Sequence, residues 1–145
     1  LDAVRHWNRL YGAAGLVQHQ AVLPGADGPA ACAEMLTQVA RSGQGSFLAV
    51  AKVFGARRSP GLLSFPRPGL SLALDFRLRP EVLRLLGRLD AITLECGGAV
   101  YPAKDACMSA RVFRAGFPRW EAFATHIDPA FSSSFWRRVT GAGYD

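Results

Sequence analysis

The sequence predicts an α+β domain in which two helices cover one face of a four-stranded antiparallel sheet. Two observations carry this prediction. Segments with apolar residues at every second position alternate with two longer segments of helical spacing, and turn-forming residues separate them. The chain has 145 residues, 50% of them hydrophobic, which is enough for one core and too little for two domains of usual size.

The first half of the pattern is a strand, a helix and a strand. Residues 15–24 alternate and end in a Pro-Gly turn. A helix begins after the Asp-Gly-Pro sequence at 27–29 and ends near Gly43. Residues 46–55 form the second strand, and a loop rich in Pro, Gly and Ser follows it.

The second half repeats this content in the order strand, helix, strand. Residues 70–78 alternate strictly, and Pro80 begins a helix that ends at a Gly-Gly pair. Residues 98–102 are a short fourth strand. The order β-α-β-β-α-β is the split βαβ pattern of ferredoxin-like domains.

Three parts of the chain are expected to differ in role. Residues 1–14 lead into the domain, residues 15–104 form the ferredoxin-like core, and residues 105–145 form a C-terminal helical extension. Short helical pieces are expected around 109–116 and 118–126, before a last aromatic segment.

Two helices can cover only one face of the predicted sheet. The leucines of the third strand, with Ala49, Ala51 and Val53 of the second, are expected to face the helices. Amides, a lysine, a phenylalanine and small residues on the other face are more typical of a ligand site than of a solvated surface. By the period-two rule this face carries Gln18, Gln20, Lys52, Phe54, Ser71, Ala73 and Asp75.

The two lysines, Lys52 and Lys104, stand out against fifteen arginines. A position that keeps a compact ammonium in such a composition suits a need for a point charge. Lys104 follows the fourth strand, so both lysines are expected to converge on the same surface. The alternative is a pair of solvated surface lysines.

Several classes of function are disfavoured by what the sequence lacks. The formal charge is +6, yet the arginines form no stripe interleaved with aromatic residues, so no nucleic-acid partner is predicted. Three cysteines without metal-ligand spacing predict neither a zinc site nor a disulfide scaffold, and mildly favour a reducing compartment. No apolar run is long enough to span a membrane, which leaves at most peripheral membrane contact.

No self-sufficient active site is visible in the sequence. It has no phosphate-binding glycine loop, nucleophile elbow or zinc-protease motif, and no paired acids for proton transfer. Each of the three histidines is expected to be structural. The chain is therefore expected to complete a site that is built elsewhere.

A set of strings along nearly the whole chain resembles one family, the FAD-dependent oxidoreductases of the vanillyl-alcohol-oxidase type. The resemblance is closest to the decaprenylphosphoryl-β-D-ribose oxidases and more distant to alditol and aldonolactone oxidases. The strings are WNRLYG (7–12), QHQ (18–20), SFLAVAKVFG (46–55), LSFPRPGLSLALDF (63–76), GGAVYPAKD (97–105), FPRWEAF (117–123) and DPAFSSSFWRRV (128–139).

This resemblance implies a C-terminal substrate or cap domain that lies over the flavin of FAD, with the FAD-binding domain upstream and outside this sequence. It implies that Lys104 approaches the flavin and the substrate as a catalytic and cofactor-binding residue. It also implies that Lys52, Phe54, Ser71 and Ala73 line the substrate pocket, with polar contacts from Gln18 or Gln20.

Two departures from the family pattern concern the pocket. Some relatives have a cysteine at the position of Ala73 and an asparagine at that of Ser71, so pocket shape and thiol reactivity do not carry over. Related enzymes usually continue the AKD string with Ser-Arg, whereas this chain has Ala106 and Cys107.

The implied reaction is oxidation of the 2-hydroxyl of a polyprenylphosphoryl ribose to a ketone, the first half of an epimerisation to arabinose, with a reductase as a possible partner. A basic, apolar stretch at 55–65 suits the entrance for such a substrate. One alternative is an alditol or aldonolactone oxidase, and another is a non-catalytic ferredoxin-like binding module. The compartment stays open between the cytoplasm and the membrane or periplasm of a bacterium.

Overall fold

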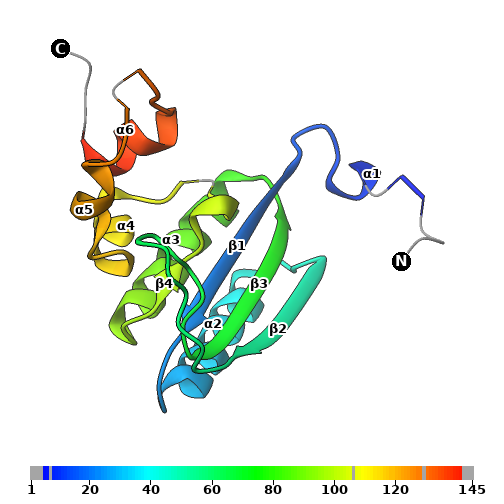
Figure 1. Cartoon of the computed structure of the whole chain (residues 1–145). Helices are drawn as coiled ribbons and strands as arrows, with labels where there is room; N and C mark the ends of the chain where they lie inside the picture. Colours follow the sequence, from blue (N-terminus) through cyan, green and yellow to red (C-terminus); the bar gives the residue numbers. More distant parts are fainter. Residues whose placement is uncertain (1–4, 7, 106, 129, 142–145) are drawn as a thin grey trace.

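The computed structural model describes residues 5–6, 8–105, 107–128 and 130–141. Figure 1 shows the elements along the chain. In order they are α1 (Asn8–Tyr11), β1 (Leu16–Leu23), α2 (Gly28–Ser42), β2 (Leu48–Phe54), β3 (Gly69–Arg77), α3 (Pro80–Glu95), β4 (Ala99–Val100), the 3₁₀ helix η1 (Pro102–Lys104), α4 (Ala110–Gly116), α5 (Trp120–Ala124) and α6 (Ser134–Thr140).

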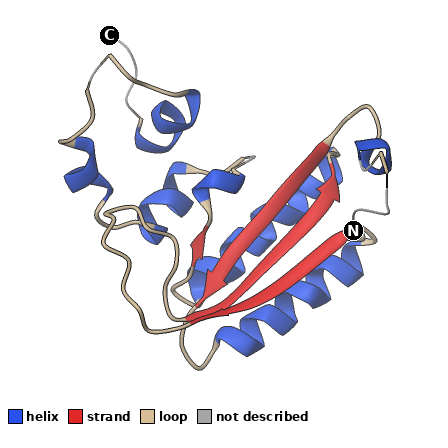
Figure 2. Cartoon of the chain, turned by 45° about the vertical axis from the view of Figure 1, so that its right-hand side comes forward, coloured by secondary structure: helices blue, strands red, loops and turns tan. Residues whose placement is uncertain are grey.

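The strands form one antiparallel sheet in the order β2-β3-β1-β4. The central pair is β1 with β3, in a register that sets Val17 opposite Phe76 and Leu23 opposite Leu70. Both long helices, α2 and α3, lie on the same side of the sheet (Figure 2). The strand order and the one-sided helices confirm the predicted ferredoxin-like α+β fold.

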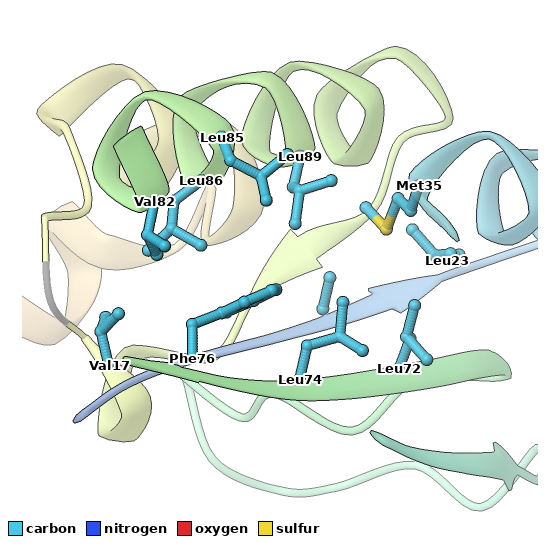
Figure 3. Packing of buried hydrophobic residues seen from close by; sticks show 11 residues of the cluster. Val17, Leu23, Met35, Leu72, Leu74, Phe76, Val82, Leu85, Leu86 and Leu89 are labelled. Carbon is cyan, nitrogen blue, oxygen red and sulfur yellow. The ribbon is translucent and has the colours of Figure 1, made fainter. Parts of the chain in front are cut away.

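The main hydrophobic core lies between the sheet and the two long helices. Figure 3 shows the apolar stripe of α3 above β3, and Met35 of α2 beside Leu23 of β1. Burying each large apolar side chain of this kind stabilises the fold by about 1.5–3 kcal/mol. The buried members are Val17, Ala21, Leu23, Met35, Leu72, Leu74, Phe76, Val82, Leu85, Leu86 and Leu89.

The edge strand β2 departs from the prediction. Ala49, Ala51 and Val53 were expected to pack under the helices, but all three are exposed, and Val53 keeps 81% of its surface in solvent. The reason is the placement of the helical layer, since α2 packs on β1 and β3 while α3 packs on β1 and β4. The helices are centred on β1, and β2 extends beyond them.

A second buried cluster lies at the β4 end of the sheet, on the face opposite the long helices. Val22 and Ala99 pair across β1 and β4 on this face. Phe65, from the loop 55–68, and Phe113 of α4 cover them. The C-terminal helices therefore pack against the sheet directly, through α4 on β4, and the loop that joins β2 to β3 contributes to the same cluster.

The ends of several elements differ from their predicted limits. The fourth strand is only Ala99–Val100, because Pro102 begins η1. Asp27 precedes α2 without a side-chain capping bond, whereas the hydroxyl oxygen of Ser133 accepts a hydrogen bond from the backbone N–H of Trp136. This cap begins α6, a helix that the sequence pattern did not reveal.

Truncating Leu85 to alanine tests the main core. Leu85 is fully buried on α3, so Leu85→Ala should lower the free energy of unfolding by about 2–5 kcal/mol. Leu83→Ala on the same helix is the matched control, because Leu83 is 39% exposed, and it should cost about 1 kcal/mol or less. Equal losses in urea unfolding would contradict the assigned face of α3.

Candidate functional site

The candidate site is the face of the sheet turned away from α2 and α3, which we call the open face. Gln18 lies opposite Asp75 across β1 and β3, and Lys52 lies opposite Ser71 across β2 and β3. Alternate residues of each strand share a face, so the register places the predicted substrate contacts on this one surface. They are Gln18, Gln20, Lys52, Phe54, Ser71 and Ala73.

A polar network occupies one end of the open face. The carboxylate of Asp75 accepts hydrogen bonds from the side-chain amide of Gln18 and from the hydroxyl of Tyr11, the latter at 3.3 Å. The ring of Tyr11 packs edge-on against Phe47 with 5.4 Å between centroids. Asp75 lies on the predicted face, where it is a hydrogen-bond acceptor that holds Tyr11 over the sheet.

The middle of the open face is a flat floor of small side chains. The amide of Gln20 donates a hydrogen bond of 3.2 Å to the hydroxyl of Ser71. Gln20 and Ala73 are each 8% exposed, and Ser71 is 1% exposed. The polar groups of this floor therefore bond to each other and expose little surface of their own.

An aromatic wall bounds the other end of the open face. The ring of Phe54 meets Phe65 edge-on at 6.1 Å, and Phe65 stacks on Tyr101 at 4.5 Å. Phe54 is half-buried by this contact, whereas Lys52, two residues earlier on β2, is exposed. The wall runs from β2 to the residue before η1, across the width of the sheet.

Lys104 lies at the edge of the sheet. It is the last residue of η1, and its backbone N–H donates a hydrogen bond of 3.0 Å to the carbonyl of Tyr101. A small hollow beside its exposed side chain is bordered by Gln18 from the open face and by His19 and Asp90 from the helix side. Lys104 therefore borders both faces of the sheet.

The two lysines do not meet. Lys52 is on β2 and Lys104 follows β4, so β3 and β1 lie between them. Three strand spacings of about 4.8 Å put the two edges roughly 14 Å apart. The two lysines were predicted to converge on one surface, but they do not form a cluster. A ligand that contacts both ammonium groups must span the sheet.

Sequence patterns missed two contacts, one beside Lys104 and one at the Asp75 end of the open face. His19 and Asp90 form a buried pair with 3.0 Å between Nε2 and Oδ1, which ties β1 to α3 beneath the hollow. His19 was expected to be structural, and this contact agrees with that expectation. Tyr11 was not predicted at the site, since no local pattern signals a contact with Asp75, 64 residues away in the sequence.

No family model matches the chain, whereas known proteins do match it. The chain is 37% identical over 145 residues to the decaprenylphosphoryl-β-D-ribose oxidase of Mycolicibacterium smegmatis, covering 96% of this chain and 31% of that protein. This chain is a relative of that oxidase. The match confirms the resemblance given by the sequence strings. The chain spans less than a third of the relative's length.

Within the described ranges, no three His, Cys, Asp or Glu side chains gather as they would around a metal ion. None of the helices in the described part of the chain is both long and apolar enough to cross a membrane.

The environment of Tyr11 gives a pH-dependent prediction. Burial, and then the Asp75 carboxylate, raise the pKa of Tyr11 above its ordinary value near 10. The folded protein thus favours the neutral phenol of Tyr11. Its contribution to the free energy of unfolding is present below pH 10 and is lost as pH rises through the raised pKa. In an ultraviolet titration of tyrosinate, the difference between the parent protein and Tyr11→Phe should show a midpoint above pH 10. A difference midpoint at or below pH 10 would contradict this environment.

Proposed function

We propose that this chain is the substrate-facing part of an FAD-dependent oxidase of the vanillyl-alcohol-oxidase type, which oxidises the 2-hydroxyl of a polyprenylphosphoryl ribose to a ketone. The observation that carries the proposal is the 37% identity, over 96% of the chain, to an oxidase named for decaprenylphosphoryl-β-D-ribose. Binding of the FAD phosphates is assigned to other parts of such an enzyme, because the chain corresponds to 31% of the relative.

The charge distribution around Lys104 fits a place beside the flavin. Lys104 is exposed, and none of the ion pairs among the described residues involves it. An ammonium without a carboxylate partner can stabilise negative charge that develops on a neighbouring group. FAD, when bound, would accept the hydride that leaves the carbinol carbon. Lys104 would hold the charge that this transfer creates.

The open face supplies binding groups and no evident base. Lys52 is exposed on β2 and can donate to a sugar hydroxyl or a phosphate oxygen. The Asp75 carboxylate is 8% exposed and already accepts bonds from Tyr11 and Gln18. We therefore assign Lys52 to substrate binding and Asp75 to the support of the face.

Substitution of the two lysines in the complete gene product tests these roles. Lys104→Ala should slow flavin reduction by substrate by about 100-fold or more, or weaken flavin retention, because it removes the charge beside the cofactor. Lys52→Ala should mainly raise KM, because it removes a substrate contact. Stopped-flow flavin absorbance measures the first effect and steady-state kinetics the second.

Arg88→Ala is the control, since Arg88 is an exposed cation on α3 in the helical layer, and it should behave as the parent protein. Unchanged flavin reduction and retention in Lys104→Ala would remove Lys104 from the mechanism. Oxidation of free alditols or aldonolactones, with none of a polyprenylphosphoryl ribose, would replace the proposed substrate by the competing one.

A further inference from the structure

A second hollow lies outside the open face, between the loop 55–68 and the turn after α4. Its volume is about 370 Å³, within the range of sites that hold small ligands. Figures 1 and 2 both show the long loop after β2 running toward the C-terminal helices, where residues 116–119 complete the lining. The roles proposed for Lys52 and Lys104 do not involve this hollow.

Four arginines line the hollow, and they make it strongly basic. Arg57, Arg58 and Arg119 are exposed, and Arg67 is half-buried. In the described part of the chain none of the four forms an ion pair with a carboxylate. Four uncompensated guanidinium groups around one depression favour an anion, and phosphate matches the geometry of guanidinium donors best.

The fold holds one of these arginines in place. The Nη2 group of Arg67 donates a hydrogen bond of 2.9 Å to the carbonyl of Gly116, and its guanidinium lies 5.7 Å from the centre of the Phe117 ring. Burial lowers the pKa of Arg67, yet an arginine stays charged at neutral pH. The cation is thus fixed between the loop and α4 before any ligand arrives.

The loop itself is braced, and the rest of the lining is largely apolar. The hydroxyl of Ser59 donates to that of Ser64 at 2.6 Å, and the backbone N–H of Ser64 bonds to the carbonyl of Gly61. Leu62, Phe117 and several prolines share the hollow with the arginines. A free phosphate ion would leave this apolar surface uncovered, whereas an amphiphile would cover it.

The hollow and the aromatic wall of the open face share one loop, in which Phe65 lies between two lining residues of the hollow, Ser64 and Pro66. Phe65 belongs to the same loop, and its ring contacts Phe54 on one side and Tyr101 on the other. A molecule with its sugar over the open face could pass the aromatic wall and reach the arginines with its next group. In a lipid-linked sugar that group is a phosphate, followed by hydrocarbon.

We propose that the hollow between loop 55–68 and residues 116–119 binds a phosphate group that carries an apolar chain. The source is either the phosphate of the lipid-linked sugar, which rests on the proposed function, or the headgroup of a membrane lipid. Both present the same chemistry to Arg57, Arg58, Arg67 and Arg119.

The test compares binding of farnesyl phosphate, inorganic phosphate and farnesol to the complete gene product by calorimetry. The triple variant Arg57→Gln/Arg58→Gln/Arg119→Gln removes exposed cations only, so the fold should persist, which circular dichroism checks. The matched control is Arg41→Gln/Arg84→Gln/Arg88→Gln, which removes the same charge from exposed positions on α2 and α3. Flotation with phosphatidylcholine vesicles, with and without phosphatidylglycerol, forms the second arm.

Farnesyl phosphate should bind more tightly than inorganic phosphate or farnesol. The triple variant of Arg57, Arg58 and Arg119, the hollow variant, should bind farnesyl phosphate about tenfold or more weakly, while the affinity of the control variant stays within about twofold of the parent protein. Loss of vesicle binding by the hollow variant, without any farnesyl phosphate binding, identifies a membrane headgroup as the source. Equal losses in the two triple variants, or inorganic phosphate binding as tightly as farnesyl phosphate, would overturn the proposal.

Failure of this site and failure of the proposed function give different results. If farnesyl phosphate binding depends on the arginines but no polyprenylphosphoryl ribose is oxidised, the function is wrong and the site stands. If that substrate is oxidised with equal KM in both triple variants, the function stands and the hollow does not hold the substrate phosphate.

Discussion

The register between β1 and β3 is the constraint on which the rest of the structure depends. It sets Val17, Ala21 and Leu23 toward the helices and leaves Gln18 and Gln20 on the open face. A slip of one residue would turn every side chain of β1 to the other face, burying two amides under α2 and α3. The hydrophobic core and the candidate site are therefore specified by the same pairing, and neither can change without the other.

The open face is closed at its two ends by segments that are distant in the sequence. Tyr11 covers the Asp75 end through a hydrogen bond, and Phe65 covers the other end through its aromatic contacts. Between them lies a floor of small, almost fully buried residues. Lys52 and Lys104 lie at the two edges of the sheet, on either side of this floor.

The fold could be predicted from the sequence because local patterns agree with the tertiary structure. The strict alternation of β3 and the apolar stripe of α3 each determine one face, and the order of elements then leaves few topologies. The exposure of Ala49, Ala51 and Val53 could not be predicted, since alternation assigns a face but does not say whether a helix covers it. The contacts of Tyr11, Asp90 and Arg67 depend on long-range packing that no local pattern records. The face shared by the predicted substrate contacts followed from periodicity alone, whereas the separation of the two lysines depended on strand order.

Backbone NMR of β1 and β3 measures this register directly. The account predicts cross-strand nuclear Overhauser effects that connect Gln18 with Asp75 and Gln20 with Ala73. Effects that connect Gln18 with Leu74 or Phe76 instead would show a shifted pairing. That result would place the amides beneath the helices and contradict both the core and the candidate site.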